Sequence, residues 1–360
     1  MQHLVKALTT SMSLKLRARA LPLLVLSILM PTLESTRLVW SQEPSATEQK
    51  TAEKAAEKAA EKPAEKPAEK PAEKPVPEKR NPAKPAHKEL LNIPYGEHAR
   101  QILDFYSPTA DKPTPVVLYI HGGGWQNGDK RINPKEYLEA GIAVAAINYR
   151  YVRNGVEEKL EPPVMAPLQD AARALQFVRS KAADWNVDKQ RIGATGGSAG
   201  GCSSLWLAFH PEMAKPDSED PIARESTRLF CAAVNGAQVS LDPQELREWM
   251  PNYKYGAHAF GLGNLDRVLE ERERLLPWIK EYSPIEHVSA DDPPIALFYK
   301  GEVPVVGASP KDPTHSGILG LKLKERLDSV KVDTVLVHPG QTHERYKTAA
   351  DYLIDRLKKS

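Results

Sequence analysis

The chain's length, composition and charge exclude several classes of protein. It has 360 residues, with 49 Lys and Arg against 47 Asp and Glu, and a net charge of +2 at pH 7. Nucleic-acid binding depends on uncompensated positive charge, so this balance argues against a nucleic-acid partner. The two cysteines, Cys202 and Cys231, can form at most one disulfide, which excludes a small scaffold held together by several bridges.

The first 41 residues have the features of an export signal. Four basic residues between Lys6 and Arg19 precede a mostly apolar stretch at 21–30, and Ser41 is a small residue of the kind that precedes a signal-peptidase cleavage site. The alternative is an uncleaved membrane anchor, although the stretch is shorter than the roughly 20 residues that span a bilayer. Both interpretations predict that the folded part is exported: periplasmic, secreted or tethered to the surface.

Residues 42–88 are predicted to be a disordered linker. Most of this segment repeats AAEK and then PAEK, so that a proline recurs at every fourth position. Proline removes a helical hydrogen bond and clashes with the preceding turn, and the segment has almost no apolar side chains to bury. The linker is either a tether that holds a domain away from a membrane or wall, or low-complexity sequence without a function.

The remaining residues, 89–360, suit a single domain of the α/β class. Short apolar segments alternate with amphipathic helical patterns, which predicts a mostly parallel sheet covered by helices on both faces. Such sheets bind ligands at the carboxyl ends of their strands. The predicted strands are 101–106, 116–120, 142–149, 191–195, 230–234, 294–299 and 333–338.

The strongest catalytic signal is the segment GGSAGG at 196–201, which lies between a predicted strand and a helix. It contains the G-x-S-x-G pattern of a nucleophile elbow, in which a sharp turn exposes a serine hydroxyl at a helix N-terminus. Ser198 is therefore the candidate nucleophile. The alternative, a phosphate-binding loop, requires Lys and Ser/Thr after the last glycine, whereas Cys202 follows here.

A second glycine motif, HGGGW at 121–125, directly follows the strand predicted at 116–120. Glycines allow backbone N–H groups to approach a carbonyl oxygen without obstruction by side chains, as an oxyanion hole requires. We predict that Gly123, Gly124 and Ala199 donate these N–H groups. A plain glycine-rich turn is the alternative, and the serine motif downstream makes that alternative weaker.

Together with NYRY at 148–151 and SPIEHVSADDPP at 283–294, these motifs resemble the α/β-hydrolase superfamily, in particular the hormone-sensitive-lipase-like and BD-FAE-like bacterial esterases. The resemblance covers about residues 91–357. It implies a serine hydrolase of small carboxylic esters, of carboxylesterase or acetylesterase type, with a catalytic triad in the order serine, acid, histidine. The export signal, together with analogy at the level of the fold, suggests acylated carbohydrates as substrates.

The resemblance places the catalytic base after the last strand, where His343 follows the segment Pro339–Thr342. His338, at the end of that strand, is the competing candidate and is more consistent with a structural role. This chain has Thr342 where related esterases often have glycine. We predict that His343 takes the proton of Ser198.

The acid is expected after the strand at 294–299, which argues against Asp291 and Asp292 on its other side. Two candidates remain. Asp312 keeps the Asp-Pro context of related esterases but follows a longer loop than usual, and Glu302 lies closer to the strand. We predict Asp312, with Glu302 as the alternative.

No cofactor is expected for this chemistry, and none of the ten histidines lies in an H-E-x-x-H motif, so no metal site is predicted. Two other functions compete with the esterase. A serine peptidase of the prolyl-oligopeptidase type shares this core but has a second large domain, and a binding module could retain the scaffold without catalysis. An aromatic-rich insertion at about 240–285 is either a lid or local packing.

Overall fold

The computed structural model describes residues 87–359. The predicted signal peptide, 1–41, and the predicted linker up to residue 86 lie outside the described residues. The linker boundary requires a correction, because residues 87 and 88 already belong to the first strand. Within 87–359, no helix combines the length and apolar character needed to cross a bilayer.

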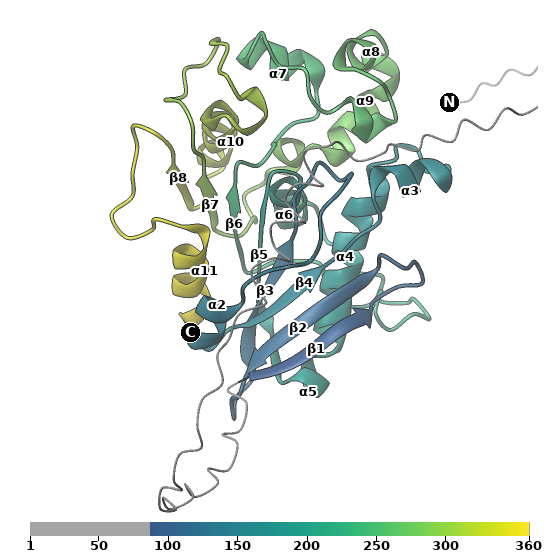
Figure 1. The fold of residues 1–360 in the computed structure, drawn as a ribbon, viewed down its shortest axis with the longest axis vertical. Helices are drawn as coiled ribbons and strands as arrows, with labels where there is room; N and C mark the ends of the chain where they lie inside the picture. The colour runs from purple at the N-terminus through teal and green to yellow at the C-terminus, as the bar shows by residue number, and fades with distance from the viewer. Residues whose placement is uncertain (1–86, 360) are drawn as a thin grey trace, which may run out of the picture. The chain divides into compact units, whose positions relative to one another are not determined.

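The described domain is built on a single sheet of eight strands, ordered β1-β2-β4-β3-β5-β6-β7-β8 (Figure 1). Strand β2 runs antiparallel to both of its neighbours, whereas β4, β3, β5, β6, β7 and β8 are parallel. The predicted α/β class with a mostly parallel sheet is therefore confirmed. The strands are β1 (His87–Pro94), β2 (Ile102–Pro108), β3 (Thr114–Ile120), β4 (Ala143–Ile147), β5 (Val187–Gly197), β6 (Cys231–Asn235), β7 (Ile295–Phe298) and β8 (Thr334–Val337).

Helices cover both faces of this sheet. The α-helices of the described residues are α2 (Lys135–Glu139), α3 (Val152–Glu157), α4 (Met165–Ser180), α5 (Ala182–Trp185), α6 (Ala199–Phe209), α7 (Pro243–Trp249), α8 (Leu265–Glu270), α9 (Arg272–Tyr282), α10 (Gly317–Ser329) and α11 (Ala349–Lys358). Three short 3-10 helices are η1 (Ala257–Phe260), η2 (Pro284–His287) and η3 (Pro313–His315).

The apolar residues form two clusters, one on each side of the sheet. Alternate residues of β3 show the division, since Leu118 belongs to the larger cluster with α4, α6 and α10, and Val117 to the smaller one with α2 and α11. Figure 1 shows α2 and α11 together beside one end of the sheet and α4 behind β4. Cys202 and Cys231 are buried and free, so no disulfide joins them.

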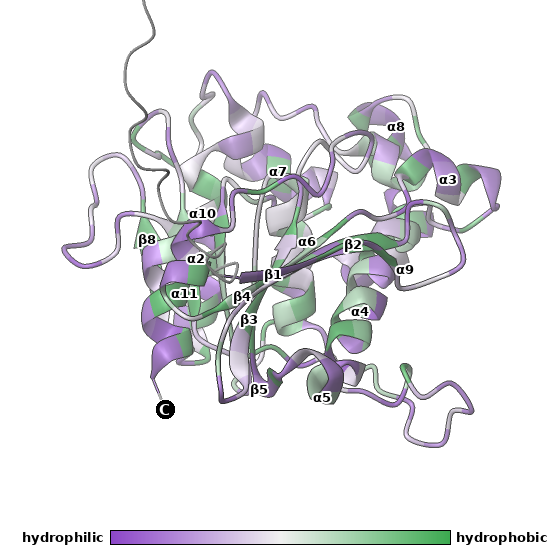
Figure 2. Ribbon diagram, turned by 60° about the horizontal axis from the view of Figure 1, so that its bottom comes forward, coloured by the Kyte–Doolittle hydropathy of each residue, from purple (hydrophilic) through white to green (hydrophobic). Residues whose placement is uncertain are grey.

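Strand β1 was missed by the sequence analysis, and its composition explains why. It begins with three hydrophilic residues, which Figure 2 colours purple. Its pairing with β2 is interrupted between Leu90 and Ile93, where Asn92 has a φ of 55°. This irregularity breaks the two-residue alternation by which a strand is recognised from sequence.

The insertion between β6 and β7 is packed into the domain. Tyr253 and Phe260 are buried in the larger apolar cluster. Backbone contacts also join the insertion to the loop after β7, because Gly307 donates its N–H to the carbonyl of Trp249 and Asn252 Nδ2 donates to the carbonyl of Pro310. The structure thus favours local packing over a free lid, and these contacts support the loop that carries Asp312.

Candidate active site

Ser198 lies at the junction between β5 and α6, at the carboxyl edge of the sheet. It is the residue before the first turn of α6 and has φ 53° and ψ −125°, a conformation that non-glycine residues rarely adopt. A Cβ on Gly200 would overlap the carbonyl oxygen of Ile120 at the end of β3. The small residues of the motif therefore allow the start of α6 to pass against β3, and this close approach holds the serine in its strained turn.

The glycine loop after β3 is held by an aromatic pair. The ring of His121 stacks on Tyr149 at a centroid distance of 4.2 Å, and Tyr149 Oη donates to the His121 carbonyl at 2.7 Å. His121 Nδ1 in turn donates to the carbonyl of Gly122 at 2.8 Å. Burial lowers the pKa of His121 to about 4, so at neutral pH it is an uncharged support for the loop. Tyr149 is the second residue of the NYRY motif, so this motif contributes to the support of the glycine loop.

The three residues predicted to form an oxyanion hole are Gly123, Gly124 and Ala199. Gly123 and Gly124 have φ values of 94° and 62°, and a Cβ on Gly124 would overlap Tyr255 Oη. Ala199 is the first residue of α6, whose N-terminal N–H groups have no partner within the helix. Among residues 87–359, Gly123, Gly124 and Ala199 donate no backbone hydrogen bond outside those that form the helices and strands.

The structure places His315 against the serine. His315 Nε2 lies 2.9 Å from Ser198 Oγ, and His315 Nδ1 lies 2.8 Å from Asp312 Oδ2. Both residues come from the short turn at η3, where Asp312 Oδ1 also accepts the backbone N–H of His315 at 3.3 Å. Because a carboxylate only accepts, the proton of a neutral His315 is on Nδ1 and its Nε2 lone pair faces the serine hydroxyl.

The prediction that His343 contacts Ser198 has to be corrected. Tyr346 is buried in the smaller apolar cluster beside α11 and stacks on His343 at a centroid distance of 4.7 Å. His343 Nδ1 accepts the backbone N–H groups of Arg345 and Tyr346. In Figure 1 the yellow loop between β8 and α11 projects to the side of the sheet. The anchoring of Tyr346 thus draws His343 toward α11, away from the serine.

The structure also shows the contacts of Asp312, Glu302 and His338, the other candidates from the sequence. Asp312 contacts the histidine that faces Ser198, whereas Glu302 accepts the backbone N–H of Lys311 at 3.3 Å and steadies the loop. His338 ends its strand in a turn, paired with Gln341. His315 precedes the last strand, whereas the resemblance places the base after it, so the sequence did not identify His315 as the base. The available signal was the Asp-x-x-His spacing, which brings two side chains to one side of a single turn.

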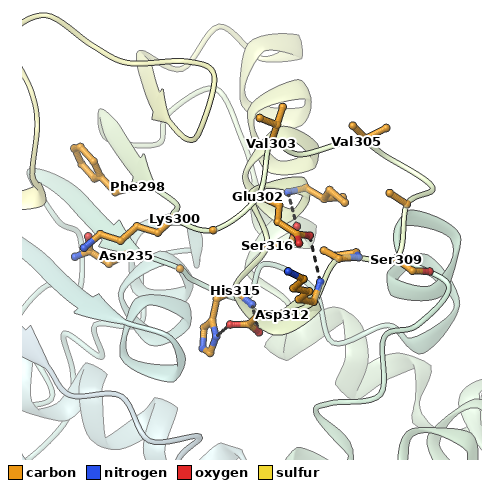
Figure 3. Close-up of a pocket in the computed structure, with 16 residues that line it drawn as sticks. Asn235, Phe298, Lys300, Glu302, Val303, Val305, Ser309, Asp312, His315 and Ser316 are labelled. Carbon is orange, nitrogen blue, oxygen red and sulfur yellow. Dashed lines mark hydrogen bonds and ion pairs between the residues drawn. The ribbon is translucent and has the colours of Figure 1, made fainter.

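A cavity of about 620 Å³ adjoins the histidine and the acid at the carboxyl ends of β6 and β7. Figure 3 shows His315 and Asp312 together on one side, Phe298 and Lys300 on another, and the side chains of Val303 and Val305 farther out along the loop. Val303 and Val305 are among the exposed large apolar residues. The cavity therefore has an apolar rim, and the charged side chain of Lys300 lines it.

Comparison with known proteins identifies the family. The BD-FAE family model matches residues 103–309, which is more than half of the chain. The chain belongs to the BD-FAE family. The match includes the glycine loop and the serine elbow, and it ends before Asp312, His315 and His343. Family membership therefore supports the nucleophile region and leaves the choice between the two histidines to the structure.

Two curated relatives are similar to parts of this BD-FAE chain. "Probable carboxylic ester hydrolase LipM" of Mycobacterium tuberculosis is 31% identical over 219 residues, which cover 58% of this chain and 46% of that protein. "Probable isoprenylcysteine alpha-carbonyl methylesterase ICMEL1" of Oryza sativa subsp. japonica is 34% identical over 134 residues, which cover 36% of this chain and 30% of that protein. The matched region thus spans less than half the length of either relative.

Among solved structures, a truncated carbohydrate esterase from gut microbiota superposes with a TM-score of 0.55. It is 22% identical and covers 78% of this chain and 100% of that one. At this level of identity the similarity shows the fold alone. The α/β-hydrolase fold expected from the motifs is therefore confirmed for this member of the BD-FAE family.

Proposed function

We propose that the protein is a serine hydrolase of small carboxylic esters, with Ser198 as nucleophile, His315 as base and Asp312 as the residue that orients His315. The observation that carries this proposal is the 2.9 Å contact between Ser198 Oγ and His315 Nε2, made at a strained serine on a helix N-terminus. A serine acts as a nucleophile when an adjacent base accepts its proton. The esterase names of the curated relatives support the same activity.

In the acylation step, Ser198 Oγ attacks the ester carbonyl carbon while its proton moves to His315 Nε2. Asp312 Oδ2, which already accepts the proton on Nδ1, stabilises the resulting imidazolium. The tetrahedral intermediate then collapses with cleavage of the bond to the alcohol oxygen. The alcohol leaves with the proton from Nε2, and the acyl group remains on Ser198.

In the deacylation step, a water molecule gives a proton to His315 Nε2 and attacks the acyl carbon. The carboxylic acid leaves and the proton returns to Ser198 Oγ. The same three N–H groups, of Gly123, Gly124 and Ala199, stabilise the oxyanion in both steps. Each such donor is worth about 10²–10³ in rate, and the positive end of α6 adds to their effect.

The test of this proposal is the reaction of the serine itself. The purified chain is expected to hydrolyse p-nitrophenyl acetate and to be labelled by a fluorophosphonate on Ser198, as located by peptide mass spectrometry. Ser198→Ala is expected to lose both, and Ser204→Ala, a buried serine in the same helix α6, is the matched control. Full activity in Ser198→Ala would refute the proposal, and preferential cleavage of aminoacyl amides would favour a peptidase.

We further propose that the substrates carry short acyl groups and include acylated carbohydrates. The cavity beside His315 has room for a small acyl group and a sugar-sized alcohol, and the solved neighbour from gut microbiota is a carbohydrate esterase by its title. Activity on p-nitrophenyl esters is expected to fall from acetate to octanoate. Acetylated xylo-oligosaccharides release acetate if the proposal is right, and a preference for long acyl chains would contradict it.

Export is the third part of the proposal, and residues 1–41 carry it through their basic and apolar pattern. Fusion of this segment to a reporter that is active only outside the cytoplasm is expected to give activity. Mass spectrometry of the mature N-terminus then separates cleavage after Ser41 from retention as an anchor. A reporter that stays in the cytoplasm would contradict export.

A further inference from the structure

Three elements of the domain end at one place, remote from the serine. His210 directly follows α6, Glu281 is in the last turn of α9, and His287 is the last residue of η2. One potential ligand atom from each of these side chains lies within 4.8 Å of the others. The fold thus joins two imidazoles and one carboxylate that are up to 77 residues apart in the chain (287 − 210).

The contacts of His210 turn its Nε2 toward the carboxylate of Glu281. His210 Nδ1 lies 2.9 Å from the carbonyl oxygen of Pro211, a contact that holds the ring in place. His210 Nε2 lies 3.1 Å from Glu281 Oε1, so an imidazole nitrogen and a carboxylate oxygen face the same point. Both atoms are of the kind that bind Zn²⁺.

The second histidine is also fixed by a backbone carbonyl. His287 Nε2 lies 2.6 Å from the carbonyl oxygen of Glu281, and Trp206 Nε1 donates to the same oxygen at 2.8 Å. The rings of His210 and His287 lie 4.7 Å apart between centroids. Histidines that bind metals usually donate their other ring N–H to a carboxylate or a backbone carbonyl, which fixes the ring and its tautomer.

The surrounding backbone also favours a cation. Helices α6 and α9 are each 11 residues long, and both have their carboxyl ends at this cluster. The unpaired carbonyl groups of a helix C-terminus carry a partial negative charge, which attracts cations. Arg228, a basic residue beside the cluster, donates to the carbonyl of His210 and has its charge paired with Asp291.

We propose that His210, Glu281 and His287 form a binding site for a divalent transition-metal ion, with Zn²⁺ as the representative ion. Two imidazoles and one carboxylate are ligands of the borderline type that Zn²⁺, Co²⁺ and Ni²⁺ prefer over Mg²⁺ or Ca²⁺. The proposal revises the expectation of no metal site. That expectation rested on a local sequence motif, and these ligands come together only in the folded chain.

The site is structural by position. Helix α6 lies between Ser198 and His210, which separates these two residues by roughly 18 Å at 1.5 Å per residue. A metal ion here would join the far end of the helix that carries the nucleophile to the end of α9 and to η2. Binding should therefore raise thermal stability without participating in ester hydrolysis.

The experiment is zinc binding by the full chain, produced without a polyhistidine tag and treated with a chelator. Isothermal titration is expected to show one Zn²⁺ per chain, and saturating Zn²⁺ should raise the Tm by on the order of 5 °C. Co²⁺ should give the visible absorption of a tetrahedral or five-coordinate site. His210→Gln, His287→Gln and Glu281→Gln should each lose the Tm shift and the cobalt spectrum.

The matched control is His87→Gln, because His87 forms a surface pair with Glu89 and, among residues 87–359, belongs to no such cluster. This control should bind zinc as the unmodified chain does. Circular dichroism and p-nitrophenyl acetate hydrolysis check that each variant is folded. Unchanged zinc binding in all three ligand variants would overturn the proposal, as would an unmodified chain that binds neither Zn²⁺ nor Co²⁺.

Discussion

The two halves of the proposed active site are built differently. The half that carries Ser198 consists of backbone packed against backbone, where β3, β5 and the start of α6 leave no room for a Cβ at Gly200. The half that carries His315 and Asp312 is a three-residue turn, and these side chains are 43% and 63% exposed. The nucleophile is thus fixed by the core, and the base by a surface loop.

This difference shows which residues of such a site can be supplied by different loops. A strained serine requires many neighbours to hold it, so its surroundings are constrained in sequence and in space. A histidine needs only to reach the serine Oγ from a loop of suitable length. In this protein the loop after β7 provides both the proposed acid and the proposed base, while the loop after β8 is anchored elsewhere by Tyr346.

The largest expected effect distinguishes the two histidines. His315→Gln should lower kcat on p-nitrophenyl acetate by on the order of 10⁴-fold, because the serine loses its base. His343→Gln should change kcat by less than about threefold, since this ring contacts Tyr346 and the backbone of its own loop. The opposite pattern would restore His343 as the base and would mean that the loop after β8 closes during the reaction.

The acid should show a smaller effect. Asp312→Asn is expected to lower kcat by about 10³-fold, because an amide cannot fix the tautomer of His315 or balance its charge, and exposure to water makes the loss smaller than for a buried acid. Glu302→Gln is the matched change in the same loop and should keep nearly full activity. A larger loss of kcat in Glu302→Gln than in Asp312→Asn would identify Glu302 as the acid.

The packed half is tested by adding one methyl group. Gly200→Ala places a Cβ against the carbonyl oxygens of Ile120 and His121, and the free energy of unfolding in urea should fall by about 3 kcal/mol or more. At Gly197 the same methyl group would meet only Asn235 O, at 3.7 Å, so Gly197→Ala should cost less than about 1 kcal/mol. Equal losses of unfolding free energy in the two variants would show that the start of α6 is not tightly packed against the end of β3.

The contribution of His121, which supports the glycine loop, to the stability of the protein should depend on pH. The pKa of folded His121 is lowered to about 4, whereas an unfolded histidine titrates near 6.5, so between these values only the unfolded chain takes up the proton. Stability should therefore fall as the pH falls from about 6.5 to about 4, by at most about 3 kcal/mol from this group. Urea unfolding at pH 7.5 and 4.5 should show a smaller loss in His121→Asn. An equal loss would assign the acid sensitivity to other groups.

Much of the fold and half of the site could be predicted from the sequence. Seven of the eight strands overlap segments that their apolar pattern predicted, and β1 does not, because hydrophilic residues and an irregular pairing hide its alternation. The serine elbow and the glycine loop are local motifs, so their geometry depends on neighbours in the chain. The base was predicted at His343 because the chain order of related enzymes suggested it, and chain order does not say where a long loop points.

The sequence by itself determined the α/β class, the turn at Ser198 and the glycines before it, because strand periodicity and the small residues of a tight turn act over a few neighbouring positions. Tertiary structure decided which histidine meets that serine and that His210, Glu281 and His287 meet at all. These contacts depend on how loops and helix ends far apart in the chain pack on the sheet. Burial of Tyr346 beside α11 and the turn at η3 set the positions of His343 and His315, and the local Asp-x-x-His spacing brings only Asp312 and His315 together.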